Sequence, residues 1–157
     1  MIVKKVPRSK TKNKTASIRD LADYIREPHN QNPDEKVLYA NGRGFFCDSH
    51  AAQREEMVAL AAESVRSKNP VNHYIMSWRE GEQPSPEQVE EAVSIFMEEL
   101  GWKEHQAIYG LHKDTDNIHL HIAINRVHPE TLKIVEINRG FDIEMAHKAI
   151  ARIEHAQ

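Results

Sequence analysis

The chain has 157 residues, of which 39% are hydrophobic and 29% are charged. These values are typical of one soluble globular domain and exclude a disordered or membrane-embedded chain. Cys47 is the only cysteine, so no intrachain disulfide can form and a cytoplasmic location is expected. No apolar run approaches the roughly 20 residues of a membrane span, so we expect no membrane insertion.

The net charge of -3 is divided unevenly along the chain. Residues 1–19 carry seven basic side chains and no acidic one, whereas the remainder holds 14 basic against 24 acidic side chains. This asymmetry is typical of a protein that contacts phosphates locally and gains its specificity from bases and shape. The alternative is a solvated basic arm that has no partner. The predicted phosphate contacts are Lys4, Lys5, Arg8, Lys10, Lys12 and Lys14.

The first predicted elements are a short strand over residues 2–6 and a helix that begins after Ser17 and ends at Pro28. Ser17 can cap this helix, because Asp20 follows three residues later. A buried stripe with helical spacing is formed by Ile18, Leu21, Ala22 and Ile25. Tyr24 lies about 110° from the centre of this stripe, so its hydroxyl can reach solvent or a ligand. A tyrosine in such a position is usually structural.

The middle of the chain carries clear turn and capping signals. Asn41-Gly42 favours a tight hairpin turn between two short strands, over residues 36–40 and 43–47. Ser85, Pro86 and Gln88 form a strong helix start, and Gly101 suits the end of that helix. The other predicted elements are a helix from Asp48 or Ser49 to about Ser67, strands over residues 71–78, 104–112, 118–127 and 132–137, and a helix over residues 141–155.

Three histidines and two acids are closely spaced around the turn before the strand at 118–127. His119 and His121 alternate along this strand, so they share a face about 6.6 Å apart. The turn can return His112 to the same face. Asp114 and Asp116 could then accept the second ring N–H of a ligating imidazole. Isolated histidines on sheets are mostly structural, but this pattern predicts a metal site with three nitrogen ligands.

Three stretches resemble the motifs of the MobP class of conjugative DNA relaxases, which belong to the endonucleases with a His-hydrophobe-His core. SIRDLADYI resembles the first motif, Ser77-Trp78-Arg79-Glu80-Gly81-Glu82 the second, and HKDTDNIHLHIAINRVHP the third. The resemblance implies that Tyr24 attacks DNA and that Ser77 binds DNA beside the nick. It also implies that His119 acts as a metal ligand, as a base, or as both. Asn125 and Arg126, in the third motif, are further predicted DNA contacts.

A tyrosine nucleophile sets chemical demands on the rest of the site. A neutral phenol, whose pKa is ordinarily near ~10, is a poor nucleophile. A divalent ion on His112, His119 and His121 could bind a nonbridging phosphate oxygen while Tyr24 attacks. The products would be a 5′-phosphotyrosyl DNA and a free 3′-OH. Imidazole ligands suit Zn, Ni or Co, which could fill the site in a crystal, whereas the resemblance implies Mg or Mn.

The order of elements predicts an α/β fold with a central, mainly antiparallel sheet and helices packed chiefly on one face. We expect residues 1–157 to form one relaxase domain, the N-terminal part of a longer protein. The resemblance implies single-stranded origin-of-transfer DNA, with or without a hairpin, as the substrate. It further implies relaxosome accessory proteins, a coupling protein and a type IV secretion system as partners, in the cytoplasm of a bacterial donor cell.

Three alternatives remain open. The chain could be a noncatalytic module for single-stranded nucleic acid, in which Tyr24 and Trp78 stack on bases. It could be a hydrolase that uses metal-bound hydroxide and forms no covalent intermediate. A rolling-circle replication initiator is closer in chemistry, but the position of SIRDLADYI upstream of the histidines argues against it.

Overall fold

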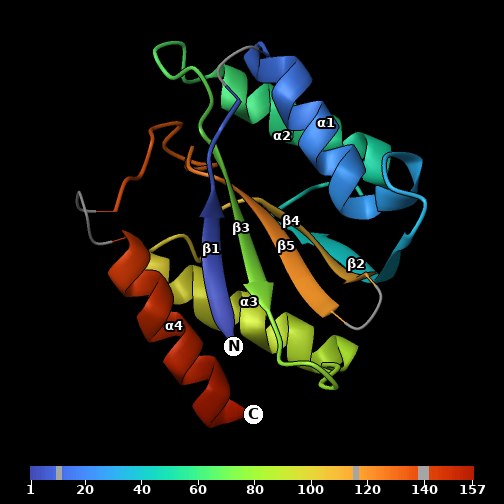
Figure 1. The fold of residues 1–157 in the computed structure, drawn as a ribbon. Coiled ribbons are helices and arrows are strands. Elements are labelled where there is room, and N and C mark those ends of the chain that lie inside the picture. Colours follow the sequence, from blue (N-terminus) through green and yellow to red (C-terminus); the bar gives the residue numbers. More distant parts are fainter. Residues whose placement is uncertain (10–11, 115–116, 138–141) are drawn as a thin grey trace.

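A five-stranded antiparallel sheet forms the centre of the molecule, with the strand order β1-β3-β5-β4-β2 (Figure 1). The computed structural model describes residues 1–9, 12–114, 117–137 and 142–157. Its elements are β1 (Ile2–Val6), α1 (Lys14–Arg26), a single 3-10 turn (Pro28–Asn30), β2 (Glu35–Arg43), α2 (His50–Ala62), β3 (Val71–Ser77), α3 (Pro86–Leu100), β4 (Ala107–Asp114), β5 (Asn117–Asn125) and α4 (Asp142–Ala156). None of the helices in the described part of the chain is long and apolar enough to cross a bilayer.

The two faces of the sheet have different chemistry because side chains alternate along each strand. On the central strand β5, Leu120, Ile122 and Ile124 lie on one face, where they pack in the larger core under α3 and α4. His119, His121 and Ala123 lie on the other face. We refer to this second face as the histidine face.

A pair of helices covers each side of the sheet, as Figure 1 shows. Helices α3 and α4 close the larger core, where Trp102, Tyr74 and Phe96 are fully buried. Helices α1 and α2 cover the histidine face around β4 and β5 with a smaller core of Ile18, Ile25, Met57 and their neighbours. The predicted antiparallel sheet is confirmed, but the helices are shared between its faces more evenly than we expected. The stripe on α1 is buried against β4 and β5, which places that helix on the histidine face.

Several local predictions are confirmed by the caps. Ser85 and Gln88 form a reciprocal capping box at the start of α3, and Gly101 ends the helix in the left-handed conformation with φ 85°. Ser49 caps α2 by accepting a hydrogen bond from the Ala52 amide. These signals act within a few residues, so the sequence alone was sufficient to find them.

Three predicted elements differ from the structure. Strand β2 runs through Asn41-Gly42 without a turn, because these residues pair with Tyr109 and Ile108 of β4. The long ladder with β4 outweighs the local turn preference. Of the strand predicted over residues 132–137, the described residues form only an isolated bridge between Val127 and Ile134. Helix α1 also starts earlier than predicted, at Lys14, with Asn13 as its cap.

Gly110 allows α1 to lie directly on β4. A Cβ atom at this position would lie 2.4 Å from the Ile25 carbonyl oxygen and 3.1 Å from the Ile25 Cγ2 atom. Such a contact cannot be accommodated without moving the last turn of α1, which carries Tyr24. The absence of a side chain therefore sets the distance between this helix and the sheet.

We expect Gly110→Ala to lower the free energy of unfolding by about 1–3 kcal/mol, because the added methyl group overpacks the junction. Urea denaturation followed by circular dichroism measures this change. Gly81→Ala is the matched control, because nothing lies within 4 Å of its Cβ position and its cost is limited to backbone strain at φ +87°. A Gly110→Ala protein as stable as the wild type would contradict this account of the junction.

Candidate active site

The hairpin of β4 and β5 brings the predicted histidines to one face of the sheet. His112 pairs directly with His119 across the two strands, and His119 pairs with Ser77 on β3. Because directly opposed residues of antiparallel strands share a face, His112, His119 and Ser77 form a row across the sheet. His121 lies two residues along β5 on the same face. The predicted return of His112 to this face is confirmed.

Among the described residues, one group of side chains is close enough for shared metal binding: Glu35, His112 and His121. Their potential ligand atoms all lie within 4.8 Å of one another, and all three residues are buried. The His112 and His121 rings lie 4.4 Å apart, centroid to centroid. His119 does not belong to this group. The structure thus brings two of the three predicted histidine ligands together with the carboxylate of Glu35.

One ring nitrogen of His112 is hydrogen-bonded, and the other has no hydrogen-bond partner. Its Nε2 atom lies 2.6 Å from the Ile25 carbonyl oxygen. Because a carbonyl can only accept, Nε2 carries the proton and Nδ1 presents a lone pair. Nδ1 is buried without a hydrogen-bond partner and lies 3.8 Å from a carboxylate oxygen of Glu35. A buried lone pair beside a carboxylate fits a cation, so the residues present suit a divalent metal.

Tyr24 lies against this group. Its hydroxyl donates to the Glu35 carboxylate, with oxygen distances of 2.9 and 3.1 Å. Its ring packs edge-on against the His112 and His121 rings at 5.4 and 5.3 Å. Burial raises the pKa of Tyr24 well above its ordinary value, and Glu35 and Asp114 raise it further. The phenol is therefore neutral at physiological pH and needs its proton removed before it can act as a nucleophile.

Two side chains of β3 hold the histidines of β5. His73 Nε2 lies 3.0 Å from His121 Nδ1, and Ser77 Oγ lies 2.8 Å from His119 Nδ1. Burial, with like charge nearby, lowers the pKa of His121 to about 2 and that of His73 to about 4. Both imidazoles are therefore neutral at physiological pH, which is the form that binds metal ions.

Glu35 and His73 were not predicted as site residues. Glu35 reaches the site because β2 pairs with β4 and places it opposite Asp114. This pairing is nonlocal and has no signature in the sequence. For His73 a signal existed, because alternation along β3 places it on the same face as Ser77.

The predicted acids of the hairpin have different outcomes. Asp114 ends β4 opposite Glu35, and its negative charge contributes to the raised pKa of Tyr24. In this structure Asp114 thus disfavours ionisation of the Tyr24 phenol. Asp116 lies outside the described residues.

Two predicted DNA contacts are buried and bonded inside the protein. Asn125 has no exposed surface, and its side chain bonds to Met57, Gln106 and Val127. Arg126 is only 6% exposed and donates to the carbonyl oxygens of Asn69 and Pro70 and to Glu136. The DNA-binding prediction is wrong for both in this structure, because strand periodicity gives a face but does not show that α2 and the loop before β3 cover it.

The basic N-terminal side chains are tied to the domain to different degrees. Lys14 donates to the carbonyl oxygens of Ala61 and Ser64 at the end of α2, where a cation is favourable. Lys12 forms an ion pair with Asp20, and Arg8 donates to the Asn69 carbonyl. The described N-terminal residues therefore do not form a freely mobile basic arm. Lys10 lies outside them.

Lys4 and Lys5 point to opposite faces of the edge strand β1. Lys4 pairs with Ile75, which pairs with His121, so Lys4 is on the histidine face. It is exposed, and its charge contributes to the lowered pKa of His121. Lys5 pairs with Tyr74 and lies on the other face.

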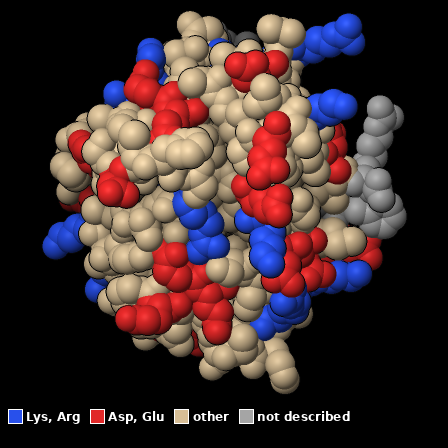
Figure 2. All heavy atoms as spheres, turned by 180° about the vertical axis from the view of Figure 1, so that it is seen from behind, with Lys and Arg blue, Asp and Glu red and all other residues tan. Residues whose placement is uncertain are grey.

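The surface seen from behind is mixed in charge. Figure 2 shows acidic side chains gathered in several patches with basic side chains between them. A continuous basic surface is not visible on this side of the molecule. The side of the molecule seen in Figure 2 therefore gives little electrostatic support for binding a phosphate backbone.

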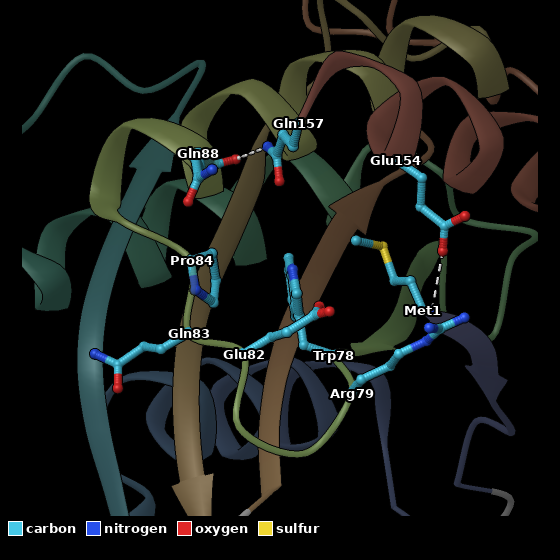
Figure 3. A pocket seen from close by; sticks show the side chains of 9 residues that line it. All are labelled: Met1, Trp78, Arg79, Glu82, Gln83, Pro84, Gln88, Glu154 and Gln157. Carbon is cyan, nitrogen blue, oxygen red and sulfur yellow. Dashed lines mark hydrogen bonds and ion pairs between the residues drawn. The ribbon is translucent and has the colours of Figure 1, made fainter.

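A cavity of about 500 Å³ lies where β3 ends. Figure 3 shows Trp78 at its centre between Pro84 and Met1, with Arg79 and Glu82 in front. Trp78 directly follows Ser77 but belongs to the core under α3 and α4, so the cavity opens on the side of the sheet away from the histidines. Trp78 as a whole is only 9% exposed, which leaves little surface for stacking on a base.

The fold and the residue cluster define an α/β protein that holds a phenol, a carboxylate and histidines on one face of an antiparallel sheet. The family profile described as relaxase, MobA/VirD2-like, nuclease domain, matches residues 24–157. The chain belongs to this relaxase family.

Similar proteins are found in two bacterial species. A protein named MobA from Acidithiobacillus ferrooxidans is 80% identical over 101 residues, which are 64% of this chain and 25% of that protein. Two proteins named TraI from Escherichia coli are 37% and 31% identical, over 82% and 90% of this chain but 17% and 19% of their own lengths. The chain thus spans a quarter or less of these relatives.

A solved structure from work on the molecular basis of vancomycin resistance transfer in Staphylococcus aureus has a similar fold. The TM-score is 0.50 at 16% sequence identity, and the match covers 78% of this chain and 68% of the other. At this level of identity, the similarity supports the fold alone.

Divalent metal binding should depend on the two clustered histidines. We expect Mn²⁺ to raise the melting temperature of the wild type, because a ligand that binds only the folded state adds about 2.7 kcal/mol at 100 times its dissociation constant. His121→Ala should lose this shift, because one of the converging ligand atoms is removed. His29→Ala, at an exposed position outside the cluster, is the control. Equal shifts in the wild type and His121→Ala would contradict a metal site at this cluster.

Proposed function

We propose that this chain is the nicking domain of a conjugative relaxase, which cleaves and religates one DNA strand at an origin of transfer. The observation that carries the proposal is the Tyr24 hydroxyl, hydrogen-bonded to Glu35 and packed against His112 and His121. Family membership supports the reaction class. Single-stranded origin DNA is the proposed substrate, and accessory relaxosome proteins, a coupling protein and a type IV secretion system are the proposed partners of a longer protein.

Tyr24 is the proposed nucleophile and Glu35 the proton acceptor. The phenol oxygen attacks the phosphorus of the scissile phosphodiester while its proton moves to the Glu35 carboxylate, 2.9 Å away. A Tyr24 oxygen to phosphorus bond forms, and the bond from phosphorus to the 3′ oxygen breaks. The DNA 5′ end stays on the protein as a phosphotyrosyl ester, and the 3′ oxygen leaves and takes up a proton. Religation is the reverse attack by the 3′-OH.

His112, His121 and Glu35 are the residues that would hold a divalent ion, with His119 across from His112 as a further proposed ligand. Glu35 would bind the ion through Oε1, which lies 3.8 Å from His112 Nδ1, and would accept the phenol proton through Oε2. When bound there, such an ion would supply positive charge to the phosphate oxygens and lower the pKa of the nearby phenol. Mg or Mn is the proposed ion in the cell, although imidazole ligands also suit Zn, Ni and Co. The role of His119 as a base is less well supported, because the acceptor that faces the phenol is Glu35.

The histidine face near β1 and β3 is the proposed approach for the DNA strand. It carries Lys4 on the edge strand and Ser77 beside His119, and the helices α1 and α2 pack on β4, β5 and the start of β3 instead. Lys4 is the predicted phosphate contact that this placement supports best, because it is exposed on the same face as the cluster. Arg8 and Lys12 are exposed as well but already have partners in the protein.

The covalent intermediate is the most direct test of the proposed function. With Mn²⁺ or Mg²⁺ and a single-stranded origin oligonucleotide, the wild type should form a protein–DNA adduct that mass spectrometry maps to Tyr24. Tyr24→Phe should form none. Tyr39→Phe, whose hydroxyl donates to Glu90 of α3, is the matched control and should retain the adduct. An adduct on another residue, or none with the wild type, would overturn the proposal.

Glu35→Gln tests the proton acceptor. We expect adduct formation to slow by about 10²–10⁴-fold, which is the usual contribution of general acid–base catalysis. Rapid-quench kinetics measures the rate, and parallel titrations with Mn²⁺ and DNA keep both saturating. Glu27→Gln, an exposed carboxylate at the end of α1, is the control. A rate within a few-fold of the wild type at saturation would rule out Glu35 as the base.

A further inference from the structure

Both histidines of β5 make the same kind of contact with β3. In each case the Nδ1 atom faces a polar side chain of β3: His73 for His121 at 3.0 Å, and Ser77 for His119 at 2.8 Å. Ser77 is directly opposite His119, whereas His73 is diagonal to His121, since its direct partner is Ala123. The two contacts thus arise from residues four positions apart on one face of β3.

The contact between two imidazoles restricts where protons can lie. A hydrogen bond between His73 Nε2 and His121 Nδ1 needs a proton on one of these atoms and a lone pair on the other. If His121 Nδ1 donates, then its Nε2 atom has the lone pair that a cation requires. If His73 donates instead, the neutral His121 carries its proton on Nε2 and cannot bind a cation through that atom.

We propose that β3 is the orienting strand of the site, with His73 and Ser77 as positioning residues. His73 accepts the Nδ1 proton of His121 and keeps its Nε2 atom available for the metal. Ser77 accepts the Nδ1 proton of His119 and leaves the lone pair on its Nε2 atom. The Ile25 carbonyl fixes His112, so His112, His119 and His121 would each have one ring nitrogen hydrogen-bonded to the protein. This inference rests on the proposed metal site.

Ser77 takes a different role in this account from direct binding of DNA. Its hydroxyl oxygen is engaged with His119, and it is half-buried between β1 and β5. A hydroxyl that accepts from His119 still has its own O–H to donate, so the contact alone does not exclude DNA binding; as a positioning residue, Ser77 would affect the reaction through the histidine. If Ser77 binds DNA directly, its loss should weaken DNA affinity. If it positions His119, its loss should slow adduct formation instead.

The test for His73 begins with the metal-free protein, so that it does not depend on the metal site. Long-range proton–nitrogen NMR spectra of ¹⁵N-histidine protein should show His121 with its proton on Nδ1. In His73→Phe this preference should be lost, and the Mn²⁺ affinity measured by calorimetry should fall by about 10–100-fold, as for other partners of metal-bound histidines. His73→Gln keeps an acceptor and should restore affinity to within a few-fold of the wild type.

The outcomes separate this inference from the proposed function. A wild-type His121 with its proton on Nε2, or a folded His73→Phe protein that binds Mn²⁺ as tightly as the wild type, would overturn the role of His73. If the wild type shows the Nδ1 proton but binds no Mn²⁺, the proposed metal site is wrong. The proposal that His73 orients His121 for the metal is then wrong as well, although the tautomer of His121 is as expected. Normal Mn²⁺ binding without any DNA adduct would count against the proposed function alone.

Ser77 is tested by separating DNA affinity from rate. Ser77→Ala should slow adduct formation at saturating DNA and alter the His119 ring spectrum, with the dissociation constant for the oligonucleotide unchanged within a few-fold. Ser77→Thr keeps the hydroxyl and should rescue both properties. A Ser77→Ala protein with weakened DNA binding and an unaltered His119 spectrum would assign Ser77 to the DNA and overturn its positioning role.

Discussion

The hydrogen bond from His112 to the Ile25 carbonyl oxygen is the contact on which the site depends. It satisfies a carbonyl in the last turn of α1, where helices lack internal partners, and it fixes the tautomer of the histidine. Gly110 makes it feasible by leaving room for the helix backbone on β4. Because Tyr24 directly precedes Ile25, the same contact places the Tyr24 phenol beside the cluster.

The electrostatics of the site explain why a cation is expected there. Glu35 and Asp114 contribute negative charge close to Tyr24, and burial keeps His121 neutral by lowering its pKa. A phosphodiester brought to this place meets acidic groups, and the phenol has a raised pKa, so neither binding nor attack is favoured by the protein charges alone. The unpartnered Nδ1 of His112 and the nearby carboxylate leave room for a positive charge that would reverse both effects.

Much of this arrangement follows from local patterns, and its gaps have physical causes. The alternation of His119 and His121 and the turn after His112 were sufficient to predict the hairpin and the shared face. Glu35 could not be predicted in this way, because its position is set by the pairing of β2 with β4. Asn125 was placed on the correct face, but α2 covers that end of the face, and sequence periodicity contains no information on what packs above a strand.

The central claim is that Glu35, His112 and His121 bind one divalent ion beside the phenol of Tyr24. Anomalous diffraction from a crystal soaked in Mn²⁺ tests it most directly. The account predicts one strong peak with these three side chains as ligands and with the Tyr24 ring still packed against the two imidazoles. A crystal without a peak at the cluster, or with the ion bound there and Tyr24 turned away from it, would contradict the account.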